Sequence, residues 1–285
     1  MTWTFREPPF ALPLSLPNAL GWVQSSAPVR ERALDNRYAY IAGQQALNQL
    51  LEKLTGETPP LFPGEGNDSG IAWRRDSLGK PFLKFTGELA NWAFQHGIED
   101  SFLHISNTND GGEHLVLAIY GEKVAGAGVD LVALDRLRAP GKDIAYFERF
   151  VMHFMSEEEL ESFQSELSRW HASGMPSPHF GDFSPFEFAL LDRYRVLSAV
   201  HFSFMESASK ACGTGLKMGV GMGLPTSLPK QSLGCDLTQT SVQLISNAES
   251  NRRMDDIGAM SAQLQARCDT KFVLTGVVFE RGESH

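Results

Sequence analysis

The chain of 285 residues is 42% hydrophobic and 21% charged, which is the composition of a globular protein with one large core or two smaller ones. This composition excludes intrinsic disorder, a collagen-like repeat and a disulfide scaffold. The formal net charge is −9 and neither half of the chain is basic, so nothing favours binding to nucleic acid or to an anionic membrane.

Targeting segments are not predicted. No apolar run reaches the roughly 18 residues that a membrane span needs. Near the N-terminus, four prolines between residues 8 and 17 interrupt an apolar stretch, and the charges of Arg6 and Glu7 cancel, so we expect no signal peptide. The three cysteines are far apart and indicate neither a disulfide framework nor a zinc site. The sequence therefore predicts a cytoplasmic protein.

The first half of the chain predicts one long helix and then several strands. Pro28 opens a helix over Val29–Leu54, with leucines near helical spacing and Gly56 just past its end. Residues 56–70 are rich in Gly and Pro and are expected to form a loop. The further elements predicted in this half are strands at Phe82–Phe85, Phe102–Ser106 and His114–Tyr120 and a helix at Glu88–His96.

The second half predicts the same order of elements. A strand at Gly126–Val132 precedes an acidic helical stretch over Lys142–Trp170. A capping box at residues 184–187 then starts a helix that is expected to end near Ala211, with Gly213 as its stop. The remaining predictions are strands at Ser232–Leu237, Ser241–Ile245 and Lys271–Phe279 and a helix near Met254–Arg267. This order predicts an α+β protein of two similar halves, joined near residues 121–126.

Glu206 and Lys210 form the most informative charged pair. They lie four residues apart on the helix predicted to end near Ala211, and hence on one face of it. A surface ion pair has the same spacing. Because the helix is apolar on most sides, however, we expect it to be buried, and charges on a buried helix are usually paired, bound to a metal or part of a site.

Asp130 is unusual because it lies inside the otherwise apolar strand Gly126–Val132. A buried carboxylate is unfavourable unless another group satisfies it. Hydrogen bonds from loop amides would be enough, and a bound cation is the alternative that points to a function.

Two weaker patterns precede Asp130 in the chain. The predicted strand Phe102–Ser106 ends in Ser106, Asn107 and Thr108, all able to hydrogen-bond an anion. A basic turn from Arg75 to Lys80 leads into an earlier strand, although a turn of this kind is commonly just solvated.

The order of these motifs is more specific than any one of them. A basic turn, a Ser-Asn-Thr strand end, a Gly-x-Asp strand, an acidic segment over residues 154–159 and Glu-x-x-x-Lys on a long helix follow one another. This order resembles the 4′-phosphopantetheinyl transferase superfamily, in its larger surfactin-type form, over about residues 28 to 245. The Ala-Cys-Gly-Thr-Gly segment after Lys210 is similar to the smaller holo-acyl-carrier-protein synthases.

The resemblance implies a fold and an activity. The fold would be a monomeric pseudo-dimer of two similar α+β halves, residues 1–123 and 124–285, with the site in the cleft between them. Members of the family move the 4′-phosphopantetheine arm of coenzyme A to a serine of an apo acyl or peptidyl carrier protein, with Mg²⁺, and release 3′,5′-ADP. The implied partners are coenzyme A and a carrier protein or domain of fatty-acid or polyketide biosynthesis, with no nucleic acid or membrane.

The resemblance also implies roles for three charged residues. Asp130 and Glu206 would be the metal ligands, and hard carboxylate oxygens are what Mg²⁺ prefers. Lys210 would reach the pyrophosphate and stabilise the charge on the departing 3′,5′-ADP. Glu206, directly or through a metal-bound water, would also accept the proton of the carrier serine.

Four further residues would bind the cofactor. Arg75 and Lys80 match the basic turn that approaches the nucleotide and its 3′-phosphate in the family. Ser106 and Asn107 match the strand end that contacts the 3′-phosphate. Val132 stands where surfactin-type members have a further acidic residue, as in the synthases, where water takes that place.

Three departures from the family pattern leave alternatives open. Met205, Asn107 and Gln44 are neutral where the family usually has a lysine, a histidine and an arginine. A lysine restored at position 205 is expected to tighten coenzyme A binding. The departures favour a divergent, non-catalytic member that binds a carrier domain or nucleotide, and a generic α+β acyl-coenzyme-A or nucleotide enzyme is a third reading. The presence of Asp130, Glu206 and Lys210 favours the active transferase.

Overall fold

The computed structural model describes residue 12 and residues 19–28, 35–60, 70–75, 81–155, 157–172, 185–213, 236–240, 254–268 and 271–282. The first half contains β1 (Gly21–Pro28), α1 (Asp35–Thr55), β2 (Ile71–Arg75), β3 (Pro81–Phe85), α2 (Gly87–Gln95), the 3₁₀ turn η3 (Asp100–Phe102), β4 (Leu103–Asp110) and β5 (Glu113–Tyr120). The second half contains β6 (Val124–Ala133), α3 (Leu134–Leu137), α4 (Ile144–Val151), α5 (Glu157–Ala172), α6 (Pro185–Cys212), β7 (Asp236–Thr240), β8 (Ala259–Cys268) and β9 (Phe272–Arg281). The fold is α+β, as predicted.

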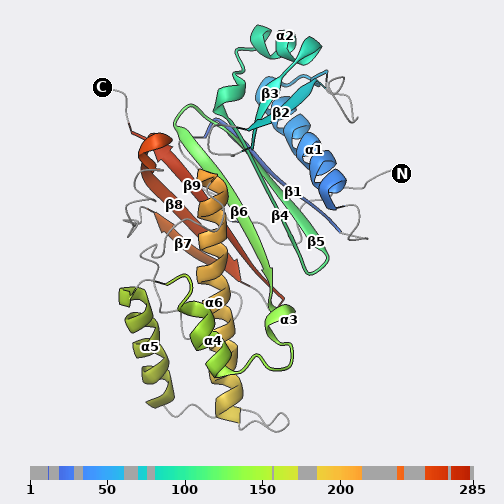
Figure 1. Cartoon of the computed structure of the whole chain (residues 1–285). Coiled ribbons are helices and arrows are strands. Elements are labelled where there is room, and N and C mark those ends of the chain that lie inside the picture. Colours follow the sequence, from blue (N-terminus) through green and yellow to red (C-terminus); the bar gives the residue numbers. More distant parts are fainter. Residues whose placement is uncertain are drawn as a thin grey trace.

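A long helix covers an antiparallel sheet in the first half (Figure 1). The strands pair in the order β1–β5–β4, and α1 packs against all three. The helix buries Ala42, Ala46 and Leu50, which recur at helical spacing along one face. It ends at Gly56, whose φ of 76° is a conformation that glycine adopts without strain. The β2–β3 hairpin and α2 lie toward one end of this unit.

The second half also places a long helix on an antiparallel sheet. Its strands pair in the order β6–β9–β8–β7, and every residue of β6 is buried. The 28-residue α6 packs on β6 and β9 and ends at Gly213, with a φ of 76°. Alongside the part of α6 that extends beyond the sheet lie α4 and α5 (Figure 1). The buried aromatic residues of this region form one cluster, which includes Phe147, Phe154, Phe163 and Tyr194.

The two sheets pack against each other through the faces that the long helices leave open. On β5, Leu115, Leu117 and Ile119 alternate with residues that face α1. Together with Val129 and Leu131 of β6, they form an apolar layer between the sheets. The site region therefore lies where strand β6 separates this apolar layer from α6.

Side chains join β4 to β6, which carry the facing edges of the two sheets. The side chains of alternate residues of β4 accept hydrogen bonds from the amides of alternate residues of β6. The residue numbers of the bonded partners increase together along both strands, so the two strands run in the same direction. The bonds run from the Val129 amide to Ser106 Oγ (3.0 Å), from the Leu131 amide to Thr108 Oγ1 (3.2 Å) and from the Ala133 amide to Asp110 Oδ2 (2.8 Å). We call this row of three bonds the seam.

Most of the predicted elements are present with small changes in their ends. The helices over Val29–Leu54 and Glu88–His96 correspond to α1 and α2, although residues 29–34 lie outside the described part of the chain. The acidic helical stretch Lys142–Trp170 corresponds to two helices, α4 and α5. The predicted junction near 121–126 is the turn between β5 and β6.

The helix predicted near Met254–Arg267 is wrong. After a short helical turn, this segment forms strand β8, which pairs with β7 and β9. Its Ala, Met, Gln and Leu residues favour a helix, but burial between two strands overrides this propensity. Strands β1 and β2 were not predicted. Of the strands expected at Ser232–Leu237 and Ser241–Ile245, only residues 236–237 lie in the described part, within β7.

Candidate active site

Helix α6 and strand β6 approach each other closely at Gly128. A Cβ atom at this position would overlap the Ser207 carbonyl oxygen and would lie 2.8 Å from the Ala211 nitrogen. Only a residue without a side chain leaves room for the helix backbone here. The contact brings the last turns of α6, with Glu206 and Lys210, beside the residues of β6 that follow Gly128.

Asp130 and Lys210 form an ion pair in this contact. Lys210 Nζ lies 2.7 Å from Asp130 Oδ1 and also donates to the carbonyl oxygen of Val129 at 3.1 Å. The Asp130 side chain is 9% exposed and that of Lys210 is 30% exposed. A pair that is buried on one side and open on the other can meet a ligand from solvent.

Glu206 lies one helical turn before Lys210 and is half-buried. Burial raises the pKa of its carboxyl group, the negative charge of Asp130 raises it further, and the positive charge of Lys210 lowers it. Among the described residues, none donates a hydrogen bond to this carboxylate. Glu206 is therefore the group of the site with unused acceptor capacity and a raised proton affinity.

Thr108 is a further member of the site, whereas the sequence indicated only that it could hydrogen-bond an anion at the end of its strand. Its Oγ1 donates to Asp130 Oδ1 at 3.0 Å and accepts from the Leu131 amide at 3.2 Å. Asp130 Oδ1 thus has two donors, Thr108 and Lys210, from opposite halves of the chain. The alternation of Ser106, Thr108 and Asp110 along one strand was the signal that could have found it.

The predicted cofactor residues are more scattered. Arg75 is exposed at the end of β2, and Lys80 lies outside the described residues. Ser106 is buried and its hydroxyl belongs to the seam, whereas Asn107 is exposed on the same strand. The structure thus brings together Asp130, Glu206 and Lys210. Ser106 lies near them through its bond to the Val129 amide, Arg75 and Asn107 are exposed on their strands, and the role of the predicted residues in binding coenzyme A stays a prediction.

Met205 faces away from the charged group. It is partly buried and packs against the aromatic cluster of α4, α5 and α6. Neighbouring residues of a helix point about 100° apart, which separates Met205 from Glu206. The expectation that a lysine at 205 would meet phosphate is therefore not favoured.

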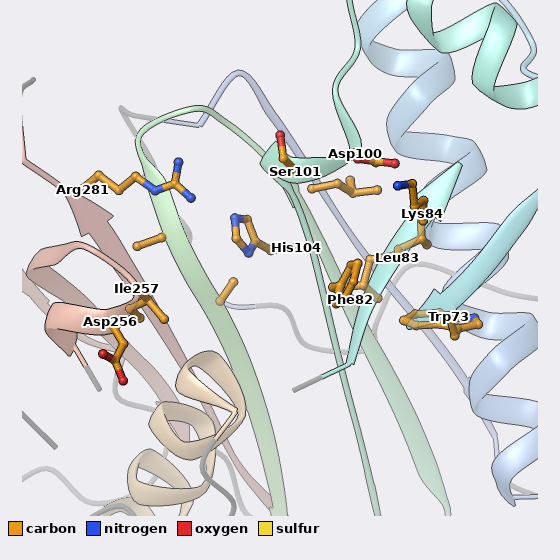
Figure 2. A pocket seen from close by; sticks show the side chains of 14 residues that line it. Trp73, Phe82, Leu83, Lys84, Asp100, Ser101, His104, Asp256, Ile257 and Arg281 are labelled. Atoms are coloured by element: carbon orange, nitrogen blue, oxygen red, sulfur yellow. The ribbon is translucent and has the colours of Figure 1, made fainter. Parts of the chain in front are cut away.

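A pocket of about 390 Å³ opens elsewhere along β4 and β6, and none of Asp130, Glu206 and Lys210 lines it. It lies between the β2–β3 hairpin and the first residues of β4 and β6, and Figure 2 shows Arg281 and Ile257 on one side, Phe82 and Trp73 on the other, and His104 between them. Its wall reaches Ala127, three residues before Asp130 on β6. The size is that of pockets that hold small organic ligands.

The protein supplies two carboxylates to the charged site. No cluster of three or more His, Cys, Asp or Glu side chains suited to a metal ion occurs in the described ranges. Two carboxylates fit Mg²⁺, which usually takes one or two together with water and phosphate oxygens. Their mutual repulsion, which contributes to the raised pKa of Glu206, is relieved by a divalent cation. The donor set therefore fits this metal.

No helix in the described residues is long and apolar enough to cross a membrane.

Comparison with known proteins gives a distant structural likeness. No family model and no curated protein matches the sequence. The holo-ACP synthase of Plasmodium yoelii is similar at a TM-score of 0.35 and 10% identity, over 56% of this chain and 97% of that one. A second structure of the acyl carrier protein synthase from Plasmodium yoelii, with ADP bound, matches at the same TM-score and 12% identity over the same shares. A likeness this distant carries no argument about activity, which must come from the site.

Proposed function

We propose that this protein transfers the 4′-phosphopantetheine arm of coenzyme A to a serine of an apo acyl or peptidyl carrier protein and releases 3′,5′-ADP. One observation carries the proposal. Asp130 and Lys210, which lie 80 residues apart, form an ion pair, and the charge of Asp130 acts on Glu206. These are the three residues on which the sequence resemblance depends.

The chemistry assigns one task to each residue. The serine hydroxyl attacks the phosphorus that carries the pantetheine arm, a new phosphorus–oxygen bond forms, and the bond to the 3′,5′-ADP oxygen breaks. Glu206 accepts the serine proton, since no described residue donates a hydrogen bond to its carboxylate. Lys210, oriented by Asp130 and the Val129 carbonyl, stabilises the charge that develops on the leaving phosphate.

Mg²⁺ is part of the proposal. Asp130 and Glu206 would hold the ion, and its charge would neutralise the pyrophosphate when bound. The pseudo-dimeric arrangement extends the proposal to the fold. In each half a long helix covers an antiparallel sheet, and we expect residues 1–123 and 124–285 to superpose as related units.

The test is transfer to an apo carrier protein. The purified chain is incubated with apo carrier protein, coenzyme A and Mg²⁺, and intact mass measures the addition of one phosphopantetheine group. We expect transfer by the wild type, none after chelation of Mg²⁺, and none with Asp130→Ala or Glu206→Gln. Lys210→Ala is expected to lower the rate more than the affinity for coenzyme A.

A matched control is Asp135→Asn, which removes an exposed carboxylate of α3 that pairs with Arg138. It should transfer at the wild-type rate. Near-normal activity of Glu206→Gln with Mg²⁺ present would show that the motif is misassigned.

A non-catalytic binding protein is the second candidate. It is favoured by the packing of Met205 away from the charged group and by the neutral Asn107. In that case coenzyme A or the carrier protein would bind, measured by calorimetry, while the mass of the carrier stayed unchanged.

A further inference from the structure

The three bonds of the seam differ in what the β4 side chain does besides accepting an amide. Asp110 is a carboxylate and has no proton to give, and its second oxygen accepts from the Gly111 amide and pairs with Arg136. Ser106 accepts a hydrogen bond from the Val129 amide. Among the three seam residues, only Thr108 both accepts a hydrogen bond from a β6 amide and donates one to a charged residue of the site.

The geometry fixes the direction of the Thr108 hydroxyl. The Leu131 amide can only donate, so it occupies an acceptor position of Thr108 Oγ1. The ionised Asp130 carboxylate can only accept, so the single hydroxyl proton points to Asp130 Oδ1. The hydroxyl thus has one arrangement that satisfies both partners.

This arrangement orients the Asp130 carboxylate. Thr108 and Lys210 both donate to Oδ1, at 3.0 Å and 2.7 Å. Within the described residues, no group donates to Oδ2. With one oxygen held from both sides and the carboxylate largely buried, Oδ2 is the oxygen left for a cation.

We propose that Thr108 is a positioning residue, which holds the Asp130 carboxylate in the orientation that binds a divalent cation. The inference rests on the proposed function insofar as that function makes Asp130 a metal ligand. Groups that hydrogen-bond a ligating carboxylate orient it and commonly change metal affinity by 10- to 100-fold when removed. The N-terminal half would thereby complete a metal site whose ligands all belong to the C-terminal half.

The test measures cation binding without any transfer reaction. Mn²⁺, used in place of Mg²⁺, is titrated into the full chain, and free Mn²⁺ is followed by electron paramagnetic resonance. Thr108→Val keeps the shape of the side chain but removes both hydrogen bonds, and its Mn²⁺ affinity should fall by about 10- to 100-fold. Thr108→Ser keeps the hydroxyl and should bind Mn²⁺ close to the wild-type affinity.

The control is Asp110→Ala, which removes a seam bond of the same kind but has no contact with Asp130. It should lower the thermal unfolding midpoint while Mn²⁺ affinity stays at the wild-type value. If Thr108→Val does not fold, Thr108→Ala replaces it, because a water molecule can then satisfy the Leu131 amide. The same loss of affinity is expected.

Two results would overturn the inference: wild-type Mn²⁺ affinity in Thr108→Val, or an equal loss of affinity in Asp110→Ala, which would mean a purely structural role.

The outcomes also separate the positioning role of Thr108 from the proposed function. Mn²⁺ binding that depends on Thr108 without transfer would refute the transferase and support the positioning role. Transfer by the wild type together with a Mn²⁺ affinity that does not depend on Thr108 would support the transferase and refute the positioning role. Failure of the wild type to bind Mn²⁺ would overturn both, since both take Asp130 as a ligand.

Discussion

At the scale of single residues, one net negative charge defines the site. Asp130 and Glu206 contribute two carboxylates and Lys210 one ammonium group, at the boundary between buried and accessible surface. Burial and the charge of Asp130 both raise the pKa of Glu206, and the ammonium group of Lys210 offsets only part of this. A bound cation would offset this remaining negative charge, and Glu206 has to be unprotonated to accept the serine proton in the proposed transfer.

Met205→Lys is predicted to destabilise the protein without improving coenzyme A binding. Met205 packs against the aromatic cluster of α4, α5 and α6, and a lysine there must bury part of its charge or leave the cluster. We expect the unfolding free energy to fall by about 1–2 kcal/mol in a urea titration. Calorimetry should show unchanged affinity for coenzyme A.

The control is Met152→Lys, because Met152 lies just after α4 and is 63% exposed. It should change stability little. Tighter coenzyme A binding by Met205→Lys at normal stability would show instead that position 205 reaches the phosphates.

At the scale of the elements, the close approach of α6 to β6 decides whether the site forms. Gly128→Ala places a Cβ atom into the helix backbone near Ser207, and neither backbone can give way locally. We expect a loss of unfolding free energy of at least 1–3 kcal/mol, the usual range for overpacking, measured by chemical denaturation.

Gly43→Ala is the matched control for this change. Its Cβ would lie 3.8 Å from the nearest atom, a ring carbon of Trp73, which is an ordinary contact. Alanine also favours a helix over glycine by about 1 kcal/mol, so this variant should be as stable as the wild type or more stable. A wild-type midpoint for Gly128→Ala would contradict the observed approach of helix and strand.

The packing of α6 against its neighbours also predicts a loss of stability in alkali. Tyr194 is buried edge-on against Phe163, and burial, followed by the charge of Glu148 and a hydrogen bond to it, raises the pKa of Tyr194 to about 12. The unfolded chain releases this proton near pH 10, so between about pH 10 and 12 the folded state holds more protons. Stability must therefore fall as pH rises through this window, by up to about 1.4 kcal/mol per pH unit from this residue.

Tyr194→Phe should remove this contribution, and Glu148→Gln should weaken it. The measurement is urea unfolding at several pH values between 9 and 12, in steps that resolve the slope. An identical slope in wild type and Tyr194→Phe would show that Tyr194 ionises alike in both states.

At the scale of the whole molecule, the sequence predicted the α+β class and singled out three charged residues that the structure brings together, because both leave local signals. A carboxylate in an apolar strand and two charges one helical turn apart can be recognised within ten residues. Strand β8 could not be predicted in this way, because only its neighbours β7 and β9 make a helix-favouring segment a strand.

The contacts that Thr108 and Gly128 make in the folded chain were not predicted, for a related reason. Thr108 meets Asp130 only because β4 and β6 lie in one particular register across two sheets. Gly128 matters only because a helix some 80 residues later crosses it. Such relations belong to the tertiary structure and leave no periodic pattern in the chain.

The seam has a consequence for how this protein can change over time. Within a sheet, neighbouring strands are tied by backbone groups that every residue possesses, so substitutions rarely undo the tie. Strands β4 and β6 are instead joined by the side chains of Ser106, Thr108 and Asp110, so a single substitution at one of these positions can strengthen, weaken or remove a bond. Substitutions at these three positions can thus change how the edges of the two sheets are joined while the backbone pairing within each sheet stays intact.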